Sequence, residues 1–527
     1  MALRLTGPAP VHDLAAPRLE SPLRPIDLLE RGCARDPDAI AVQDGAESLS
    51  YAALVRQVDA LASGLQELDA TAGSRVGICA HNTMEHLLAL LATYAAGKVW
   101  VPLNPRNGRA ELDAMVDLTQ PSLIVADATC LDRFSPPPGV SIVTGKGATG
   151  VLSVRGLIER CDGQHPPPHE RAPDAEQIIK FSGGSTGAPK AVVQSVRCLA
   201  AQAAGIQRAF EFRADDVNLV AAPLTHGTSC FILPVLGAGG RHVLCAEPKP
   251  ALVLEALGHG ITTLYAPPTL IYAMLAEPGV GARTFPVLRH LIYSAAPMAP
   301  ERIREARRVF GPVLETAYGQ VEAPQIVTAM RAAEFDDERN LTSVGRAVPP
   351  TEVAVMDEEG RALPPDTLGE IVVRGNLVMS GYLGLPELTA QTVREGWLHT
   401  GDLGIVDARG YLHIRGRLRE TINTGGFKVL PADVEAVLGR HPAVAECCVF
   451  GVPDVKWGEA VHAAVRLHEG AQATEAEIIA WVKAELDAVK APKGVHLVAS
   501  FPRTPAGKVA RAAVRAAVIG EALPAGG

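Results

Sequence analysis

Short β-type runs alternate with helical runs as far as about residue 340, and this alternation constrains the fold more than any other feature of the sequence. Arg75–Cys79 has the composition of a buried strand, and Met84–Ala96 that of a helix. Gly97 is placed to end this helix, and Val99–Leu103 follows as the next strand. Strands that alternate with helices in this way favour an α/β architecture with mostly parallel sheets.

The pattern changes after about residue 340. Turn-rich short strands follow, at Val353–Met356, Glu370–Arg374 and Gly410–Ile414, and predict a β-rich portion. A compact unit then begins near Arg419, with predicted helices at Ala432–Leu438 and Glu475–Leu486 and short strands around them. We therefore predict a large N-terminal domain, residues 1–418, and a small α+β C-terminal domain, residues 419–527.

Composition narrows the class of protein. Hydrophobic residues make up 47% of the chain and charged residues 20%, as in a soluble globular enzyme, and the net charge of -9 gives no electrostatic footprint for nucleic acid. The N-terminus lacks the apolar core of a signal peptide, and Leu87–Gly97 is too short to span a membrane. The nine cysteines contain no C-x-x-C pair, which fits thiols in a reducing compartment. We expect a cytoplasmic protein.

The strongest local signal is a loop between two apolar runs, Ile178–Phe181 and Ala191–Val193. It contains Ser182, Gly183, Gly184, Ser185, Thr186, Gly187 and Lys190. Glycines let backbone N–H groups approach an anion, while the hydroxyls and the lysine add donors and charge, as polyphosphate binding requires. P-loop spacing is absent, and a strand resumes at Ala191, so a β-hairpin is favoured. Taken alone, a hairpin turn without a ligand is the other interpretation.

This loop resembles the phosphate-loop signature of the acyl-adenylate-forming superfamily, which includes acyl-CoA synthetases, nonribosomal peptide adenylation domains and firefly-type luciferases. Other signatures of that group appear in its usual order. They are Ala317–Glu322 for Y-G-x-x-E, Gly369–Ile371 with Gly381–Tyr382, Trp397–Asp402 for [WF]-x-x-T-G-D, Gly416–Arg419 at the start of the hinge, and Pro502–Lys508 near the C-terminus. Several motifs in order over nearly the whole chain are far more specific than one.

The resemblance implies a role for each matching residue. Lys508 would bridge the acyl oxygen and the α-phosphate, Glu322 would bind Mg²⁺, and the phosphate loop would cover the β- and γ-phosphates of ATP. Asp402 would hold the ribose hydroxyls, with Arg417 nearby, and Tyr318 would lie along the adenine. The adenine would pack against Ser294, Ala295, Ala296 and Pro297, and Glu315, Ala317, Gly319 and Gln320 would also belong to the ATP site.

The resemblance also implies stacked sheets in the large domain and a mobile C-terminal lid that swings between two half-reactions. Arg419 occupies the usual hinge position, where the family most often has Asp or Lys. Gly425, Gly426, Phe427 and Lys428 would line the tunnel for the coenzyme A thiol. The implied reaction is ATP-dependent activation of a small carboxylic acid, then transfer of the acyl group to coenzyme A. An enzyme that stops at the adenylate, one that loads a carrier-protein thiol, and a regulatory nucleotide-binding protein are the alternatives; a homodimer is left open.

The acyl pocket is expected beside Ala222–Gly227, with His226, Gly227 and Cys230 as its residues. Members of the family that activate amino acids usually have an aspartate here for the substrate ammonium, and this segment has none. Because a buried ammonium without a carboxylate is unfavourable, we rank an amino acid below an aliphatic, aromatic or polycyclic acid. The identity of the acid stays open.

Overall fold

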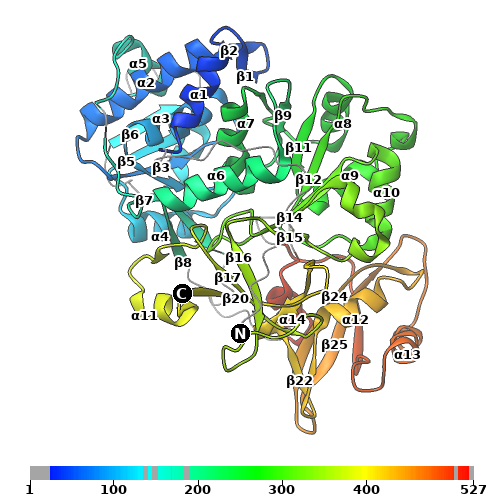
Figure 1. The fold of residues 1–527 in the computed structure, drawn as a ribbon. Helices are drawn as coiled ribbons and strands as arrows, with labels where there is room; N and C mark the ends of the chain where they lie inside the picture. The colour runs from blue at the N-terminus through cyan, green and yellow to red at the C-terminus, as the bar shows by residue number, and fades with distance from the viewer. Residues whose placement is uncertain are drawn as a thin grey trace.

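A computed structural model describes residues 24–134, 140–144, 152–167, 169–182, 190–503 and 509–520. Two large sheets with helices between and around them form the upper part of the molecule in Figure 1, and the C-terminal unit lies below. The predicted α/β class is thereby confirmed. Within the described ranges, every helix is too short or too polar to cross a membrane.

The first sheet has seven strands in the order β18-β8-β7-β4-β3-β5-β6. Their bounds are β3 Arg75–Cys79, β4 Val99–Pro102, β5 Leu123–Asp127, β6 Val140–Thr144, β7 Glu176–Ser182, β8 Lys190–Ser195 and β18 Gly381–Tyr382. The strands from β6 to β7 are parallel, whereas β7 and β8 are antiparallel, with Ser182 opposite Lys190. The two strands that flank the phosphate loop therefore form the predicted hairpin.

The second sheet has nine strands in the order β15-β14-β13-β12-β11-β9-β10-β1-β2. Their bounds are β1 Ile40–Asp44, β2 Glu47–Ser50, β9 Val217–Val220, β10 Arg241–Leu244, β11 Thr263–Ala266, β12 His290–Tyr293, β13 Leu314–Tyr318, β14 Thr328–Met330 and β15 Arg346–Ala347. The strands from β1 through β13 in this order are parallel. Their carboxyl ends meet at one edge, which is where open α/β sheets bind ligands.

The helices cover and separate these sheets. Those of the large part are α1 Asp27–Arg35, α2 Tyr51–Leu68, α3 Met84–Ala95, α4 Arg109–Thr119, α5 Val154–Arg160, α6 Val196–Phe210, α7 Ile232–Ala238, α8 Pro250–Gly258, α9 Pro268–Leu275, α10 Pro300–Phe310 and α11 Pro386–Thr392. Helix α3 is buried on all sides because it packs against β1 of one sheet and against β3 and β4 of the other. Its largely apolar sequence is typical of such a buried helix.

The β-rich portion is an antiparallel sheet in the order β16-β17-β20-β19, with β21 also paired to β20. The bounds are β16 Glu352–Met356, β17 Gly369–Arg374, β19 Val393–Arg394, β20 Trp397–Val406 and β21 Leu412–Arg417. Asp402 of β20 lies opposite Arg417 of β21 in the register. This pairing places two motif residues from different segments side by side.

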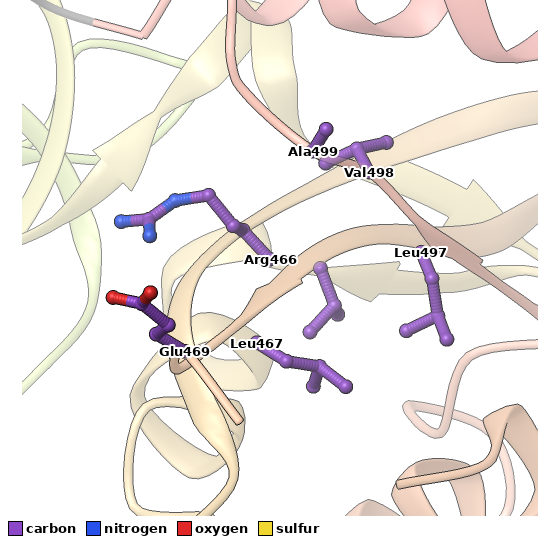
Figure 2. A pocket seen from close by; sticks show the side chains of 7 residues that line it. Arg466, Leu467, Glu469, Leu497, Val498 and Ala499 are labelled. Atoms are coloured by element: carbon purple, nitrogen blue, oxygen red, sulfur yellow. The ribbon is translucent and has the colours of Figure 1, made fainter. Parts of the chain in front are cut away.

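The C-terminal unit has its own sheet and core. Its elements are β22 Ile422–Thr424, β23 Phe427–Val429, α12 Pro431–Leu438, β24 Val444–Asp454, β25 Gly458–Leu467, α13 Glu475–Glu485, β26 Gly494–Leu497 and α14 Arg511–Ile519. The predicted α+β character is confirmed. A shallow cavity of about 460 Å³ lies where β25 meets β26; in Figure 2, Arg466 and Glu469 point to one side of it and Leu497 to the other.

Candidate active site

Asp402 is the centre of a buried polar cluster between the second sheet and the β-rich portion. Asp402 is only 4% exposed. The Tyr318 hydroxyl donates to Oδ2 at 2.7 Å, and Nε2 of Gln320 donates to the same oxygen at 2.6 Å. Nε of Arg417 lies 3.1 Å from Oδ1. Burial, and then the charge of Asp402, raises the pKa of Tyr318 well above its usual value, so the phenol remains a donor.

The backbone that follows β12 and β13 is tightly constrained. Ala295, two residues after the end of β12, has φ of 75°, a left-handed conformation that is uncommon for a residue with a side chain. Gly319, directly after β13, packs so closely that a Cβ there would lie 2.5 Å from the backbone nitrogen of Gln325. The segments Ser294–Pro297 and Ala317–Gln320 thus lie at neighbouring strand ends, as their predicted role at the adenine requires.

Glu322 lies close to the end of the phosphate hairpin. The Tyr382 hydroxyl donates to its Oε1 at 3.0 Å. Because β18 pairs with β8, Tyr382 also lies beside Lys190, whose Nζ is 5.9 Å from the centre of the Tyr382 ring. Ser182 and Lys190 end the two hairpin strands, while Gly183, Gly184, Ser185, Thr186 and Gly187 lie outside the described residues.

The predicted acyl-pocket residues lie after β9, in the turn η2 (Gly227–Phe231) and just before it. Burial, then the nearby charges of Lys180 and Arg106, lowers the pKa of His226 to about 4, so its imidazole is neutral near pH 7. Gly227 is necessary for packing, since a Cβ would lie 2.4 Å from the Tyr265 hydroxyl oxygen. Cys230 is buried, and burial raises the pKa of its thiol.

Lys180 also belongs to this region, although the sequence analysis gave it no role. It is 9% exposed, and its Nζ lies 3.1 Å from Oγ of Ser229 and 3.5 Å from the carbonyl oxygen of His226. The same nitrogen lies 5.3 Å from the centre of the Trp100 ring. The sequence did contain one indication of a special role for Lys180, because this lysine interrupts the apolar run of β7.

Glu315 lies away from the Asp402 cluster. Its carboxylate is 2.7 Å from Nδ1 of His290 and 3.8 Å from Nε of Arg331, and the residue is 2% exposed. Both contacts are made near the start of β13, whereas Ala317 and Gly319 lie at its end. The structure therefore gives Glu315 an ion-pair role in the sheet, and its assignment to the adenine site stays a prediction.

The hinge and tunnel residues belong to the start of the C-terminal unit. Arg419 lies in the short turn η6 (Leu418–Glu420) between β21 and β22. Gly425 and Gly426 form the turn of the β22–β23 hairpin, and both have positive φ. Phe427 is 60% exposed, and Nζ of Lys428 pairs with Glu358 at 2.6 Å. Lys508 lies outside the described residues.

Comparison with known proteins decides the family. The model of the AMP-binding enzyme family matches residues 29–383, and that of the AMP-binding enzyme C-terminal domain matches residues 433–508. The chain belongs to the AMP-binding enzyme family. It is therefore an adenylate-forming ligase that binds ATP, and the two matches cover both the large part and the C-terminal unit described above.

Similar proteins catalyse related reactions with different acyl acceptors. A medium/long-chain-fatty-acid–CoA ligase of Mycobacterium tuberculosis is 32% identical over 97% of this chain and 93% of its own length. The amide bond synthetase McbA of Marinactinospora thermotolerans has a TM-score of 0.84 and 30% identity, covering 94% of this AMP-binding enzyme and 99% of McbA. ATP-bound MatB of Rhodopseudomonas palustris has a TM-score of 0.85 and 29% identity. The match covers 93% of this chain and 98% of the MatB chain.

Proposed function

We propose that this enzyme is an acid–thiol ligase that makes an acyl-CoA. In the first step a carboxylate attacks the α-phosphorus of ATP and forms an acyl-adenylate as pyrophosphate leaves. In the second step the thiol of coenzyme A attacks the acyl carbon, and AMP leaves. The Asp402 cluster carries the proposal, because it joins three separate nucleotide motifs in one buried site. The relative from Mycobacterium tuberculosis, a CoA ligase, supports coenzyme A as acceptor.

In the first step, each proposed residue interacts with a different part of ATP or of the acid. Two anions have to meet, so cancelling negative charge is the main task. We assign Lys508 to the acyl oxygen and the α-phosphate, and Ser182 to Lys190 to the β- and γ-phosphates. Asp402 is the acceptor for the ribose hydroxyls, with Arg417 as a neighbouring cation. The segment Ser294–Pro297 is assigned to the adenine.

Glu322 is the proposed Mg²⁺ ligand. One carboxylate beside a phosphate loop is the kind of donor set that Mg²⁺ uses with nucleotides, since substrate phosphates supply further oxygens. The hydrogen bond from Tyr382 fixes one carboxylate oxygen of Glu322 next to Lys190. The ion, when bound, screens the phosphate charges.

The second step is assigned to rotation of the C-terminal unit. We propose a boundary between residues 418 and 419, with Arg419 as the hinge, and a lid that presents Gly425–Lys428 to the adenylate. The exposed Phe427 ring supports this role, because it is free to contact another surface. Trp457 lies directly against the same hairpin, since a Cβ on Gly425 would be 2.7 Å from its indole ring.

The assay that tests the proposal measures pyrophosphate release from a panel of acids, with and without coenzyme A, and identifies products by mass. Turnover that rises with coenzyme A, together with an acyl-CoA mass, is the expected result. Pyrophosphate release without a thioester would contradict the acceptor assignment. The enzyme would then stop at the adenylate, load a carrier-protein thiol or acylate an amine, as the similarity to McbA allows.

A change at the hinge separates the two steps. We expect Arg419→Pro to leave adenylate formation within about 3-fold of wild type and to lower thioester formation by about 10-fold or more, because the lid has to turn at this residue. Hydroxamate trapping measures the first step, and acyl-CoA release measures the second. Arg419→Ala, which leaves the backbone free to turn, is the control and should retain both steps. Equal loss of both steps in Arg419→Pro would contradict the hinge role.

A further inference from the structure

Lys180 is a buried cation without a carboxylate partner. Among the residues that the structure describes, no carboxylate oxygen lies within 4.0 Å of its Nζ; the nearest polar groups are Oγ of Ser229 and the carbonyl oxygen of His226. Both are neutral. Trp100 adds an aromatic face 5.3 Å away, which attracts a cation but carries no net negative charge. Burying a charge with neutral partners alone is unfavourable, so the position requires an explanation.

Lys98 shows how the same chain satisfies a buried lysine for purely structural purposes. Its Nζ donates to the carbonyl oxygen of Asp69 at 2.6 Å and to Oγ of Ser74 at 2.7 Å. The Asp69 carboxylate lies 3.8 Å away and supplies the opposite charge. Lys180 has hydrogen-bond partners but lacks such a counter-charge in the described part of the chain. A structural role alone therefore leaves the charge of Lys180 unexplained.

The surroundings of Lys180 add positive charge and hydrogen-bond donors. The pKa of His226 is lowered by burial first and then by the positive charges of Lys180 and Arg106, so both cations act on this turn. Gln325 lies on the other side of Gly227, with Oε1 3.0 Å from where a Cβ of Gly227 would be. Its Nε2 is buried and has no acceptor among the described residues. A ligand that enters here meets donors and cations.

The position of Lys180 connects this charge to the substrate. Its two polar partners, His226 and Ser229, belong to the turn that carries the predicted acyl pocket. Lys180 also lies two residues before Ser182 on β7, and alternate residues of a strand face the same side. The side chains of Lys180 and Ser182 therefore lie on the same face of the sheet, and Ser182 is where the phosphate loop begins.

We propose that Lys180 binds a second carboxylate at the far end of the acyl substrate, so that the preferred substrates are dicarboxylic acids. The inference rests on the proposed function, because it assumes that the acid to be adenylated enters beside His226. One carboxylate reacts at the α-phosphorus, while the other neutralises the Lys180 ammonium. The Gln325 amide supplies a further donor for an oxygen of the substrate. Charged hydrogen bonds of this kind are the strong ones.

The test compares acids that differ only in the second carboxylate. Pyrophosphate release by the full-length enzyme is measured with succinate against butanoate, glutarate against pentanoate, and adipate against hexanoate. We expect wild type to favour the dicarboxylate of its best pair by at least about 10-fold in kcat/KM. Lys180→Met should remove most of this preference through the KM for the dicarboxylate, leaving the monocarboxylate and ATP values within about 3-fold.

Matched variants isolate the charge. Lys249→Met removes an exposed lysine that pairs with the neighbouring Glu247 and should change nothing. Lys180→Gln keeps a polar side chain that donates hydrogen bonds but removes the charge, so it reports on the charge if Lys180→Met folds poorly. 4-Oxopentanoate offers a neutral carbonyl acceptor in place of the second carboxylate of succinate. Better turnover of 4-oxopentanoate than of succinate would overturn the assignment of an anionic group.

The remaining outcomes separate this inference from the proposed function. If the ratio of kcat/KM for dicarboxylate to monocarboxylate is the same in wild type and in Lys180→Met for every pair, the role of Lys180 is overturned. Adenylation itself is left intact by that result. Pyrophosphate release without acyl-CoA would overturn only the acceptor. If wild type adenylates none of these acids, calorimetry decides between the two outcomes. A dicarboxylate that binds wild type and not Lys180→Met supports the inference, and no such difference in binding overturns it.

Discussion

The two halves of the candidate site differ in how their charges are satisfied. In the nucleotide half, the Asp402 carboxylate is surrounded by three donors from Tyr318, Gln320 and Arg417. In the acyl half, the Lys180 ammonium has only neutral partners among the described residues. The first half is complete within the chain and suits the nucleotide that all AMP-binding enzymes use. The second half has no counter-charge in the described part of the chain, and by our proposal the substrate supplies it.

Lys508→Ala gives the largest expected effect and acts on both halves at once. Removing a preorganised charge at the reacting atoms should lower the rate of adenylate formation by about 10²–10³-fold, for every acid alike. Pyrophosphate release measures the loss. Lys483→Ala, at an exposed position of α13, is the control and should have no effect. An unchanged rate in Lys508→Ala would remove this lysine from the mechanism.

Asp402→Asn tests whether the nucleotide half is independent of the acid. The change keeps the size of the side chain but removes the charge that Arg417 faces, so we expect kcat/KM for ATP to fall by about 10–100-fold. The same factor should apply to a dicarboxylate and to its monocarboxylate partner. Asp357→Asn, in a turn after β16, provides the control. A loss that depends on the acid would break the distinction between the halves.

Tyr382→Phe should have a smaller effect, confined to the phosphate side. The phenylalanine keeps the ring beside Lys190 but removes the hydroxyl that orients Glu322. We expect a rate loss of about 3–10-fold and a higher Mg²⁺ concentration for half-maximal rate, with the KM for the acid unchanged. Tyr411 donates to Glu334 at 2.8 Å in the β-rich portion, so Tyr411→Phe is the matched control. An unchanged Mg²⁺ dependence in Tyr382→Phe would contradict its positioning role.

The residues assigned to the nucleotide half occur in short motifs that a single sequence displays, and their binding roles stay predictions. The hairpin at Ser182 and Lys190, the α/β class and the C-terminal unit were all predicted and are confirmed. The contacts between motifs were not predictable, since Tyr318 and Asp402 are 84 residues apart, and Glu322 and Tyr382 are 60 residues apart. Such contacts depend on which strands pair, and periodicity within one segment does not determine that.

Lys180 illustrates a different limit. In the sequence it is one polar residue in an apolar strand, and such a residue can face solvent at a strand edge or lie inside the fold. Only the packing of β7 against the turn after β9 shows that it is buried beside Ser229. Our proposal for acyl specificity therefore depends on tertiary contacts, whereas the nucleotide assignments depend on motifs.

The smallest expected effect is the contribution of the acyl half to the pH dependence of stability. The pKa of His226 is about 4 in the folded protein, below its ordinary value of 6.5. Between these values the unfolded chain binds a proton that the folded protein does not, so this group lowers stability as pH falls from about 6.5 towards 4. Burial is the main cause, and Lys180 is the second. Lys180→Met should therefore raise the pKa of His226 only in part.

Thermal unfolding at about pH 7 and about pH 5 measures this effect, because the midpoint follows the free energy of unfolding. Wild type should lose the most on acidification, Lys180→Met less, and His226→Gln least. The buried His86 and His242, whose pKa values are also about 4, contribute equally to all three proteins and cancel in the comparison. Equal losses in wild type and His226→Gln would show that the acyl half does not hold His226 neutral, and the contrast in electrostatics between the two halves would then rest on Lys180 alone.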